Sequence, residues 1–257
     1  MKKLVLVAWV ALFALASCGS SDKEFQKNPV DLLIRDMNKD STFSIVLYDM
    51  DIDEGTFSDT YKHQYQIIKN KNGEPSETKT AMQIVDKDFF MRHQNDMGME
   101  IASKTKDGKI HKQAAPAGYS NYVGNSQYGN WRTDNSGNSF WEFYGKYAMM
   151  SSMMNMMAAP IYRNSYDDYN RNYRGSQPYY GKTSTGSPAY GTQSAHVQAS
   201  KPSFFQRMQG KSSWNASSKS VGSSSSSGTT TRSSSRYSGS SSSSGSSSRS
   251  RGGGSGK

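Results

Sequence analysis

The sequence predicts an α+β fold: a small antiparallel meander with one N-terminal helix, then a second apolar, Met-rich helix and a long disordered C-terminal tail. Three observations predict it. Segments of alternating polar and apolar residues between residues 42 and 112 are separated by Asn-Gly and Asp-Gly turns. Two apolar segments, 29–38 and 140–157, follow helix-capping residues. From residue 212 onward, 24 of 46 residues are Ser, a composition that cannot offset the entropy of ordering a backbone.

The first 17 residues have the layout of a secretory signal peptide. Lys2 and Lys3 give a positive start, and residues 4–14 form an apolar run too short to span a bilayer comfortably. Small residues then precede Cys18, the single cysteine of the sequence. One cysteine allows no disulfide within the chain. A plain signal peptide, from which Cys18 is discarded, is the alternative interpretation.

Leu15-Ala16-Ser17-Cys18 resembles the lipobox of bacterial lipoproteins. This resemblance implies that Cys18 becomes the first mature residue and carries acyl chains such as palmitate, followed by a polar tether, so that residues 18–28 are the lipidated Cys and tether. The resemblance implies three acyl chains on the cysteine, and each contributes about 0.8 kcal/mol of binding free energy per buried CH₂. Together they bind a membrane more strongly than stable anchoring requires. The resemblance therefore implies a lipid-anchored protein of a bacterial cell envelope. Gly19 in place of Asp favours the outer over the inner membrane, by resemblance to enterobacterial sorting.

The first predicted helix covers residues 29–38. Asn28 can cap it, Pro29 suits its first position, and Asp31 lies in its first turn. Its apolar residues follow the helical spacing i, i+3, i+4 and i+7, and they are Val30, Leu33, Ile34 and Met37. This spacing predicts one apolar stripe that packs on the sheet.

The meander follows in residues 42–112. In the first strand, 42–52, the alternation places Phe43, Ile45 and Leu47 on one face and Val46, Tyr48 and Met50 on the other. A second strand over 60–70 leads into the Asn72-Gly73 turn.

The meander continues through residues 79–94, with Met82 and Ile84 and then Phe89 to Met91. The Asp107-Gly108 turn joins 99–104 to 109–112. Together with the first helix, these strands predict an α+β domain over residues 29–115.

Residues 116–160 combine an aromatic loop with the Met-rich helix. Ser139 and Glu142 form a capping-box pattern, and Pro160 terminates the segment, which predicts a helix over 140–157. Its six clustered methionines are Met149, Met150, Met153, Met154, Met156 and Met157. Thioethers can bind Cu(I) or Ag(I), but methionine is also an adaptable apolar filler, and we favour packing over a metal site.

Other constellations give weak signals. Asp49, Asp51, Asp53 and Glu54 have the alternate spacing of a calcium loop, but the glycine and the twelfth position depart from that pattern. His63, His93 and His111 lie on separate predicted strands or their ends and could converge. No zinc, hydrolase or nucleotide-binding motif accompanies them. We therefore predict no enzymatic activity and no cofactor.

Charge is divided unevenly along the chain. Residues 18–159 contain 16 Lys and Arg against 19 Asp and Glu, whereas residues 160–257 contain 13 Lys and Arg against two Asp. A basic C-terminal segment predicts an anionic partner. Because the signal peptide argues against nucleic acid, the candidates are anionic lipid, lipopolysaccharide or wall polymer, contacted by Arg232, Arg236, Arg249 and Arg251.

Residues 161–257 are of low complexity throughout, Tyr/Asn/Arg-rich first and Ser/Gly/Arg-rich afterwards. The spacing of the first tyrosines fits one helix face, as seen in Tyr162, Tyr166, Tyr169 and Tyr173. The Asn and Gly content nevertheless favours disorder, so we predict a disordered tail over 161–257.

Ser139-Phe140-Trp141, the methionines from Met149 and the segment Ser187–Gly191 are similar to the C-terminal half of the YgiB-type envelope lipoproteins, and Arg251-Gly252-Gly253 to their basic tail. The strand-rich part has no counterpart in that family. The resemblance implies an envelope lipoprotein and carries over no catalytic residue.

Taken together, these patterns predict a non-enzymatic, membrane-anchored envelope lipoprotein with a structural or interaction role, which contacts anionic polymers through its basic tail and can also contact an envelope protein. The alternative is a lipoprotein that binds a soft metal or a small ligand.

Overall fold

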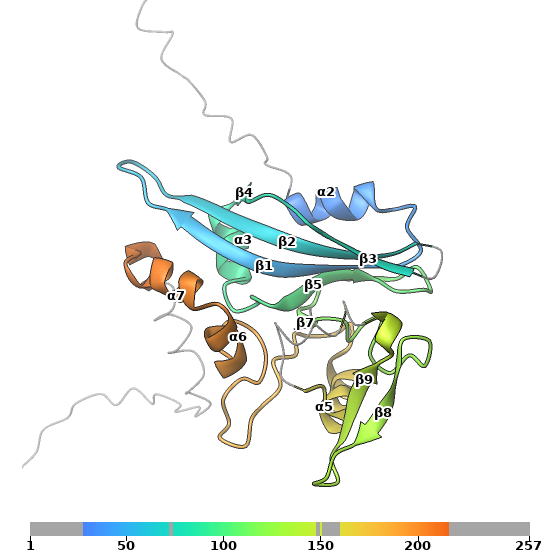
Figure 1. Ribbon diagram of the computed structural model, residues 1–257. Coiled ribbons are helices and arrows are strands. Elements are labelled where there is room, and N and C mark those ends of the chain that lie inside the picture. The colour runs from blue at the N-terminus through green and yellow to red at the C-terminus, as the bar shows by residue number, and fades with distance from the viewer. Residues whose placement is uncertain (1–27, 72–73, 148–149, 151–159, 216–257) are drawn as a thin grey trace, which may run out of the picture.

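The computed structural model describes residues 28–71, 74–147, 150 and 160–215. Within them the predicted α+β fold is confirmed, because one antiparallel sheet is covered by helices and loops on both faces (Figure 1). The seven strands of the main sheet are β1 (Phe43–Asp53), β2 (Thr60–Lys71), β3 (Glu74–Lys79), β4 (Gln83–Val85), β5 (Met99–Lys104), β6 (Ile110–His111) and β7 (Ala115–Pro116). They lie in the order β3-β2-β1-β5-β6, with β4 also paired to β2 and β7 also paired to β5.

The first helix forms as predicted. Helix α2 (Pro29–Asp36) begins after Asn28, whose side chain accepts a hydrogen bond from the backbone N–H of Val30 at 2.9 Å. This bond satisfies one of the backbone donors that a helix leaves free at its start. The apolar stripe then packs on the sheet, with Val30 and Met37 buried.

A β-bulge in β1 changes which side chains face each side of the sheet. Leu47 pairs with Tyr65 of β2, but the next pair is Asp49 with Gln64, so Tyr48 is an extra residue on β1. After an inserted residue the alternation inverts, and Met50 joins Phe43 in the same core cluster. The prediction that Met50 lies on the opposite face from Phe43 is therefore wrong.

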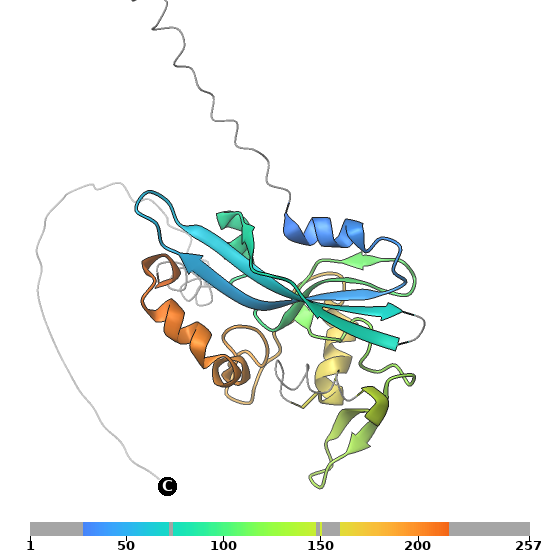
Figure 2. The same ribbon diagram turned by 45° about the horizontal axis from the view of Figure 1, so that its top comes forward.

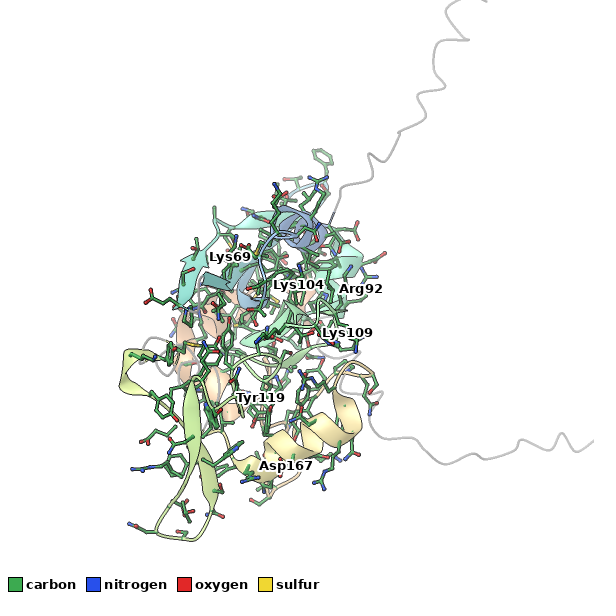
Figure 3. All side chains as sticks on the ribbon, turned by 90° about the vertical axis from the view of Figure 1, so that its right-hand side faces the viewer. Lys69, Arg92, Lys104, Lys109, Tyr119 and Asp167 are labelled. Carbon is green, nitrogen blue, oxygen red and sulfur yellow. The ribbon has the colours of Figure 1, made fainter. Side chains whose placement is uncertain are left out.

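The two faces of the sheet carry chemically different cores. On one face, Phe43, Ile45 and Leu47 pack with apolar residues of α2, α3 (Lys87–Arg92), α6 (Ala195–Ser200) and α7 (Pro202–Gln209). The other face is rich in aromatic residues. Its buried tyrosines are Tyr119, Tyr122, Tyr128, Tyr147, Tyr169, Tyr179 and Tyr190. In Figure 3, Tyr119 lies between the sheet and the segment that carries Asp167.

Two short segments adopt different structures from those predicted. Residues 87–92 form α3 where the sequence predicted a continued strand, because Asp86 caps this helix by accepting the N–H of Asp88 at 2.8 Å. The predicted helix over 140–157 is wrong in its first residues. Ser139–Phe143 is instead β9, which pairs with β8 (Gly129–Thr133).

A turn explains the second difference. Asp134 accepts the N–H groups of Ser136 and Asn138, both at 2.8 Å, and Gly137 has φ +83°, so residues 134–138 form a tight hairpin connection. This turn directs the aromatic residues that follow into a strand. A 3₁₀ turn over Gly145–Tyr147 comes next, and most of the remaining predicted helix lies outside the described residues.

The prediction of a disordered tail from residue 161 is wrong for residues 161–215. Helix α5 (Arg163–Asp168) continues into η2 (Tyr169–Tyr173), a π-helical turn, so the helical spacing of the tyrosines is realised. Tyr169 is buried in the aromatic core. Residues 216–257 lie outside the described residues.

Helix α7 covers an open edge of the sheet. Strand β5 pairs with β1 only between Phe43 and Val46, so among the described strands the second half of β1 pairs with β2 alone. Figure 2 shows α7 alongside this half of β1. Arg207 of α7 donates to both carboxylate oxygens of Asp49, at 3.1 and 3.2 Å, and to the carbonyl of Met50 at 3.4 Å. The helix thereby protects an edge that another strand could otherwise pair with.

A buried histidine should make the fold sensitive to acid. His63 is fully buried, its Nδ1 lies 3.2 Å from the Tyr65 hydroxyl, and burial together with the nearby His93 lowers its pKa to about 3. The unfolded chain takes up a proton below pH 6.5, whereas the folded chain does not until about pH 3, so stability falls as pH falls between these values. At pH 4.5 the free energy of unfolding is therefore lower than at neutral pH by about 2 to 3 kcal/mol.

The variant His63→Phe should lose less stability than the wild type between pH 7 and pH 4.5, as measured by urea unfolding of the full chain. The control is His196→Gln, which alters a partly buried histidine on α6. Equal losses in the wild type and His63→Phe would contradict this prediction.

Candidate functional site

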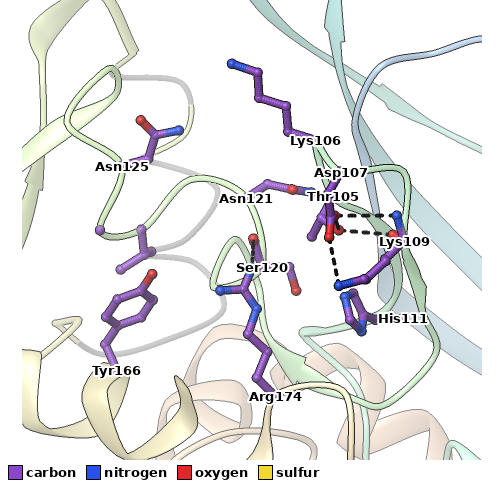
Figure 4. A pocket seen from close by; sticks show the side chains of 12 residues that line it. Thr105, Lys106, Asp107, Lys109, His111, Ser120, Asn121, Asn125, Tyr166 and Arg174 are labelled. Atoms are coloured by element: carbon purple, nitrogen blue, oxygen red, sulfur yellow. Dashed lines mark hydrogen bonds and ion pairs between the residues drawn. The ribbon is translucent and has the colours of Figure 1, made fainter. Parts of the chain in front are cut away.

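A polar cleft of about 590 Å³ opens beside the β5–β6 turn. Three segments far apart in the sequence line it: the turn at residues 105–111, the loop at residues 120–125, and the α5–η2 segment through Tyr166 and Arg174. Figure 4 shows Asn125 and Tyr166 across the cavity from the turn, with Arg174 reaching toward its centre. The sequence predicted the turn but not the cleft.

The turn that forms one wall is held by its own polar groups. The Asp107 carboxylate accepts the Thr105 hydroxyl at 2.5 Å and forms an ion pair with Lys109 at 3.1 Å. These contacts lower the pKa of Asp107 to about 2, the Thr105 hydrogen bond having the largest effect. Gly108 has φ +82°, a conformation that glycine adopts without strain. The turn therefore has a defined shape, from which Lys106 projects.

The second wall is held by one amide side chain. Nδ2 of Asn121 lies 3.2 Å from the carbonyl of Phe43, 3.2 Å from the carbonyl of Lys104 and 3.3 Å from the hydroxyl of Ser44. These acceptors belong to β1 and β5, so this contact ties the 120–125 loop to the sheet. The loop also requires a glycine, because a Cβ on Gly124 would lie 2.6 Å from the ring of Tyr166.

Arg174 comes from the third segment, directly after η2. One terminal nitrogen donates to the carbonyl of Ser120 at 2.9 Å and the other to Oδ1 of Asn170 at 3.2 Å. Next to it, a Cβ on Gly175 would lie 3.0 Å from Nδ1 of His111, so a glycine leaves room for that ring. Burial, and to a lesser extent the charge of Arg174, lower the pKa of His111, which is therefore neutral at pH 7.

Ser120 connects the cleft to a buried carboxyl. Glu100 is 1% exposed, and the hydroxyls of Ser120, Ser44 and Ser103 with the N–H of Gly118 surround it. One of its oxygens, Oε2, has no hydrogen-bond partner among the described residues. Burial raises the pKa of this carboxyl. Glu100 is a buried polar group that the sequence analysis did not single out, and its position in a strand otherwise rich in apolar residues was the available signal.

Most of the predicted site residues lie outside the described residues. They are Cys18, Met149, Met153, Met154, Met156, Met157, Arg232, Arg236, Arg249 and Arg251. Met150 is described, and it is buried in the aromatic core. This agrees with the packing role favoured for the methionines.

The calcium-like carboxylates are each occupied by a protein partner. Arg207 binds Asp49 and lies 3.8 Å from Asp51, and Lys62 pairs with Asp53. Glu54 accepts the backbone N–H of Ser212 at 2.6 Å. Within the described part of the chain, no group of three or more His, Cys, Asp or Glu residues could hold a metal ion.

The histidines converge only in part. The rings of His63 and His93 are 6.5 Å apart in the apolar core, and Asp96 bridges His93 to Tyr180 through contacts of 2.7 and 2.6 Å. His111 lies instead on the wall of the cleft. Sequence spacing could not distinguish these two environments.

Comparisons with known proteins find no matching family model, no matching curated protein and no matching solved structure. Among the described residues, no helix is both long enough and apolar enough to cross a membrane.

The buried Glu100 should make stability fall as pH rises. Because its pKa is raised on folding, the folded chain holds a proton that the unfolded chain releases above about pH 4.5. Glu100→Gln is neutral at every pH and keeps a group that can bond the serine hydroxyls. At pH 8 the free energy of unfolding of the variant should exceed that of the wild type by at least about 1 kcal/mol, and at pH 4 this gain should be smaller.

Urea unfolding of both chains at the two pH values measures this gain. The matched control is Glu142→Gln, at a half-exposed glutamate paired with Arg132. A variant that is destabilised equally at pH 4 and pH 8 would show that Glu100 acts through shape alone.

Proposed function

We propose that this protein is a lipid-anchored lipoprotein of a bacterial cell envelope, which binds anionic envelope polymers and has no enzymatic role. The observation that carries the binding role is the cleft, which Lys106, Lys109 and Arg174 line together from two segments more than 60 residues apart. The anchor rests on the signal-peptide layout and on the lipobox resemblance ending at Cys18.

The length of the tether suits this arrangement. Helix α2 begins at Pro29, so ten residues, 18–27, precede its capping Asn28. A chain of that length spans at most about 35 Å when fully extended. An anchor at Cys18 would keep the cleft close to the membrane surface and to the anionic groups there. The proposal places the protein at the outer rather than the inner membrane, since Gly19 follows the cysteine.

The basic C-terminal region supports the same partner. Residues 216–257 contain six Lys and Arg and no acidic residue. Each cation contributes about 1 kcal/mol near an anionic surface, so several together give weak, salt-sensitive binding. In this proposal Arg232, Arg236, Arg249 and Arg251 contact the polymer, and the cleft adds a defined site.

The alternative function is binding of a small ligand or of a soft metal. The cleft favours a small ligand, because its volume lies within the range of small-molecule sites. The soft-metal form rests on methionines of which only Met150 lies among the described residues, and Met150 is buried.

The anchor is tested by Cys18→Ala. We expect the variant to move from the membrane fraction to a soluble or secreted fraction, because the acyl chains are lost. Immunoblotting of fractions after a high-salt wash measures this, with Ser21→Ala as the matched control. A variant that remains in the washed membranes would refute the anchor.

The tail is tested by changing Arg232, Arg236, Arg249 and Arg251 to Gln in the full chain. Binding to anionic vesicles and to lipopolysaccharide should weaken, and its dependence on salt between about 20 and 500 mM should become shallower, because screened charge attraction supplies the binding. Cosedimentation measures both. Unchanged salt dependence would refute an electrostatic role for the tail.

A further inference from the structure

We propose that the cleft between the β5–β6 turn and η2 binds a phosphoryl group carried by a sugar. The inference rests on the proposed binding function and names the class of ligand for its site. Three properties of the cleft support it: an excess of positive charge, cations presented as separate points, and a polar lining larger than one phosphate needs.

The first property is the charge balance. Among the residues that line the cleft, Lys106, Lys109 and Arg174 are cationic, and Asp107 is the one carboxylate. Asp107 already accepts the Thr105 hydroxyl and pairs with Lys109. No described residue forms an ion pair with Lys106, which is exposed at the mouth of the cavity. The cleft thus has a net positive charge, and an anion entering it would gain a new partner in Lys106.

The second property distinguishes a phosphoryl group from a carboxylate. A carboxylate is best recognised by the two parallel N–H groups of an arginine fork. In Arg174 both terminal nitrogens already donate, one to Ser120 and the other to Asn170, so the fork is held in place by the protein. The remaining cations are lysines, which act as compact point charges. Two point charges on the turn, with the fixed Arg174 guanidinium on another wall, suit a tetrahedral group with several charged oxygens better than a planar group.

The third property is the lining beyond the cations. The hydroxyl and amide groups of Ser120, Asn121, Asn125 and Tyr166 share the cavity, and its volume of about 590 Å³ leaves room beside a phosphate. The ring of Tyr166 packs edge-on against Tyr119 at 5.4 Å and at a tilt against Trp131 at 5.6 Å, so this side of the cavity is preorganised. A sugar supplies the several hydroxyl groups that such a lining can bond.

The experiment measures binding by titration calorimetry to the full chain carrying Cys18→Ala, which removes the lipid. The probes are glucose 1-phosphate, inorganic phosphate, glucuronate and glucose. We expect glucose 1-phosphate to bind more tightly than inorganic phosphate, and glucuronate and glucose to bind at least tenfold more weakly. The His111 imidazole resonances should shift on binding, which would locate the ligand in the cleft.

Lys106→Gln is the decisive variant, because no described residue forms an ion pair with this exposed side chain and the fold should be unaffected. We expect it to weaken binding of glucose 1-phosphate about tenfold. The matched control is Lys87→Gln, at an exposed lysine on α3, and it should leave binding unchanged. Equal binding of glucuronate and glucose 1-phosphate, or binding that Lys106→Gln leaves intact, would overturn the proposal.

Two further measurements complete the test. The first distinguishes a lipid headgroup from a soluble sugar phosphate as the source of the phosphoryl group, and the second distinguishes binding in the cleft from binding by the tail. Phosphatidylglycerol vesicles that bind through Lys106, without binding of soluble glucose 1-phosphate, would assign the site to a lipid headgroup and overturn the sugar ligand. Loss of glucose 1-phosphate binding in the tail variant, but not in Lys106→Gln, would assign it to the tail. In that case the cleft proposal fails while the proposed polymer-binding function survives, because the latter is tested by the tail and anchor variants.

Discussion

The bulge at Tyr48 governs how this chain covers both faces of one sheet. Before it, odd-numbered residues of β1 face the core that holds Phe43; after it, even-numbered residues do. If β1 alternated regularly through Tyr48, with no bulge, Met50 and Ile52 would face the tyrosine-rich core and Asp51 the core that holds Phe43, where a buried charge is strongly unfavourable. The bulge instead places Asp49 and Asp51 beside Arg207, which attaches α7 to the otherwise open edge of β1.

The cleft depends on the same sheet, through loops anchored to it. Asn121 joins the 120–125 loop to β1 and β5, and Arg174 joins η2 to that loop at Ser120. Each contact is polar and lies close to the aromatic core, so the walls are fixed by directional bonds as well as by packing. Such a preorganised cavity loses little entropy when a ligand binds, which favours a defined site over diffuse charge attraction.

Aromatic residues explain why a chain with only 33% hydrophobic residues can fold over so much of its length. Tyrosine buries a large apolar ring and carries a hydroxyl group that can form hydrogen bonds. Many of the rings pack edge-on, such as Tyr119 with Tyr190, whose ring centroids are 5.8 Å apart. Their hydroxyls also bond one another, as in the 2.8 Å contact between these two residues. The Tyr/Asn/Arg composition after residue 161 resembled a disordered segment because composition does not report this mode of packing.

Local signals in the sequence by themselves determined the capped helix after Asn28, the first two strands, the antiparallel pairing of β2 with β3 and the turn at Asp107-Gly108. Each of these depends on residues close together in the chain, whose preferences reinforce one another. The tertiary structure alone decided the face on which Met50 lies, the strand at Ser139–Phe143, the ordering of residues 161–215 and the cleft around Arg174. All four depend on partners far away in the sequence, and long-range packing overrides local propensity when the buried area or the hydrogen bonds it contributes are large.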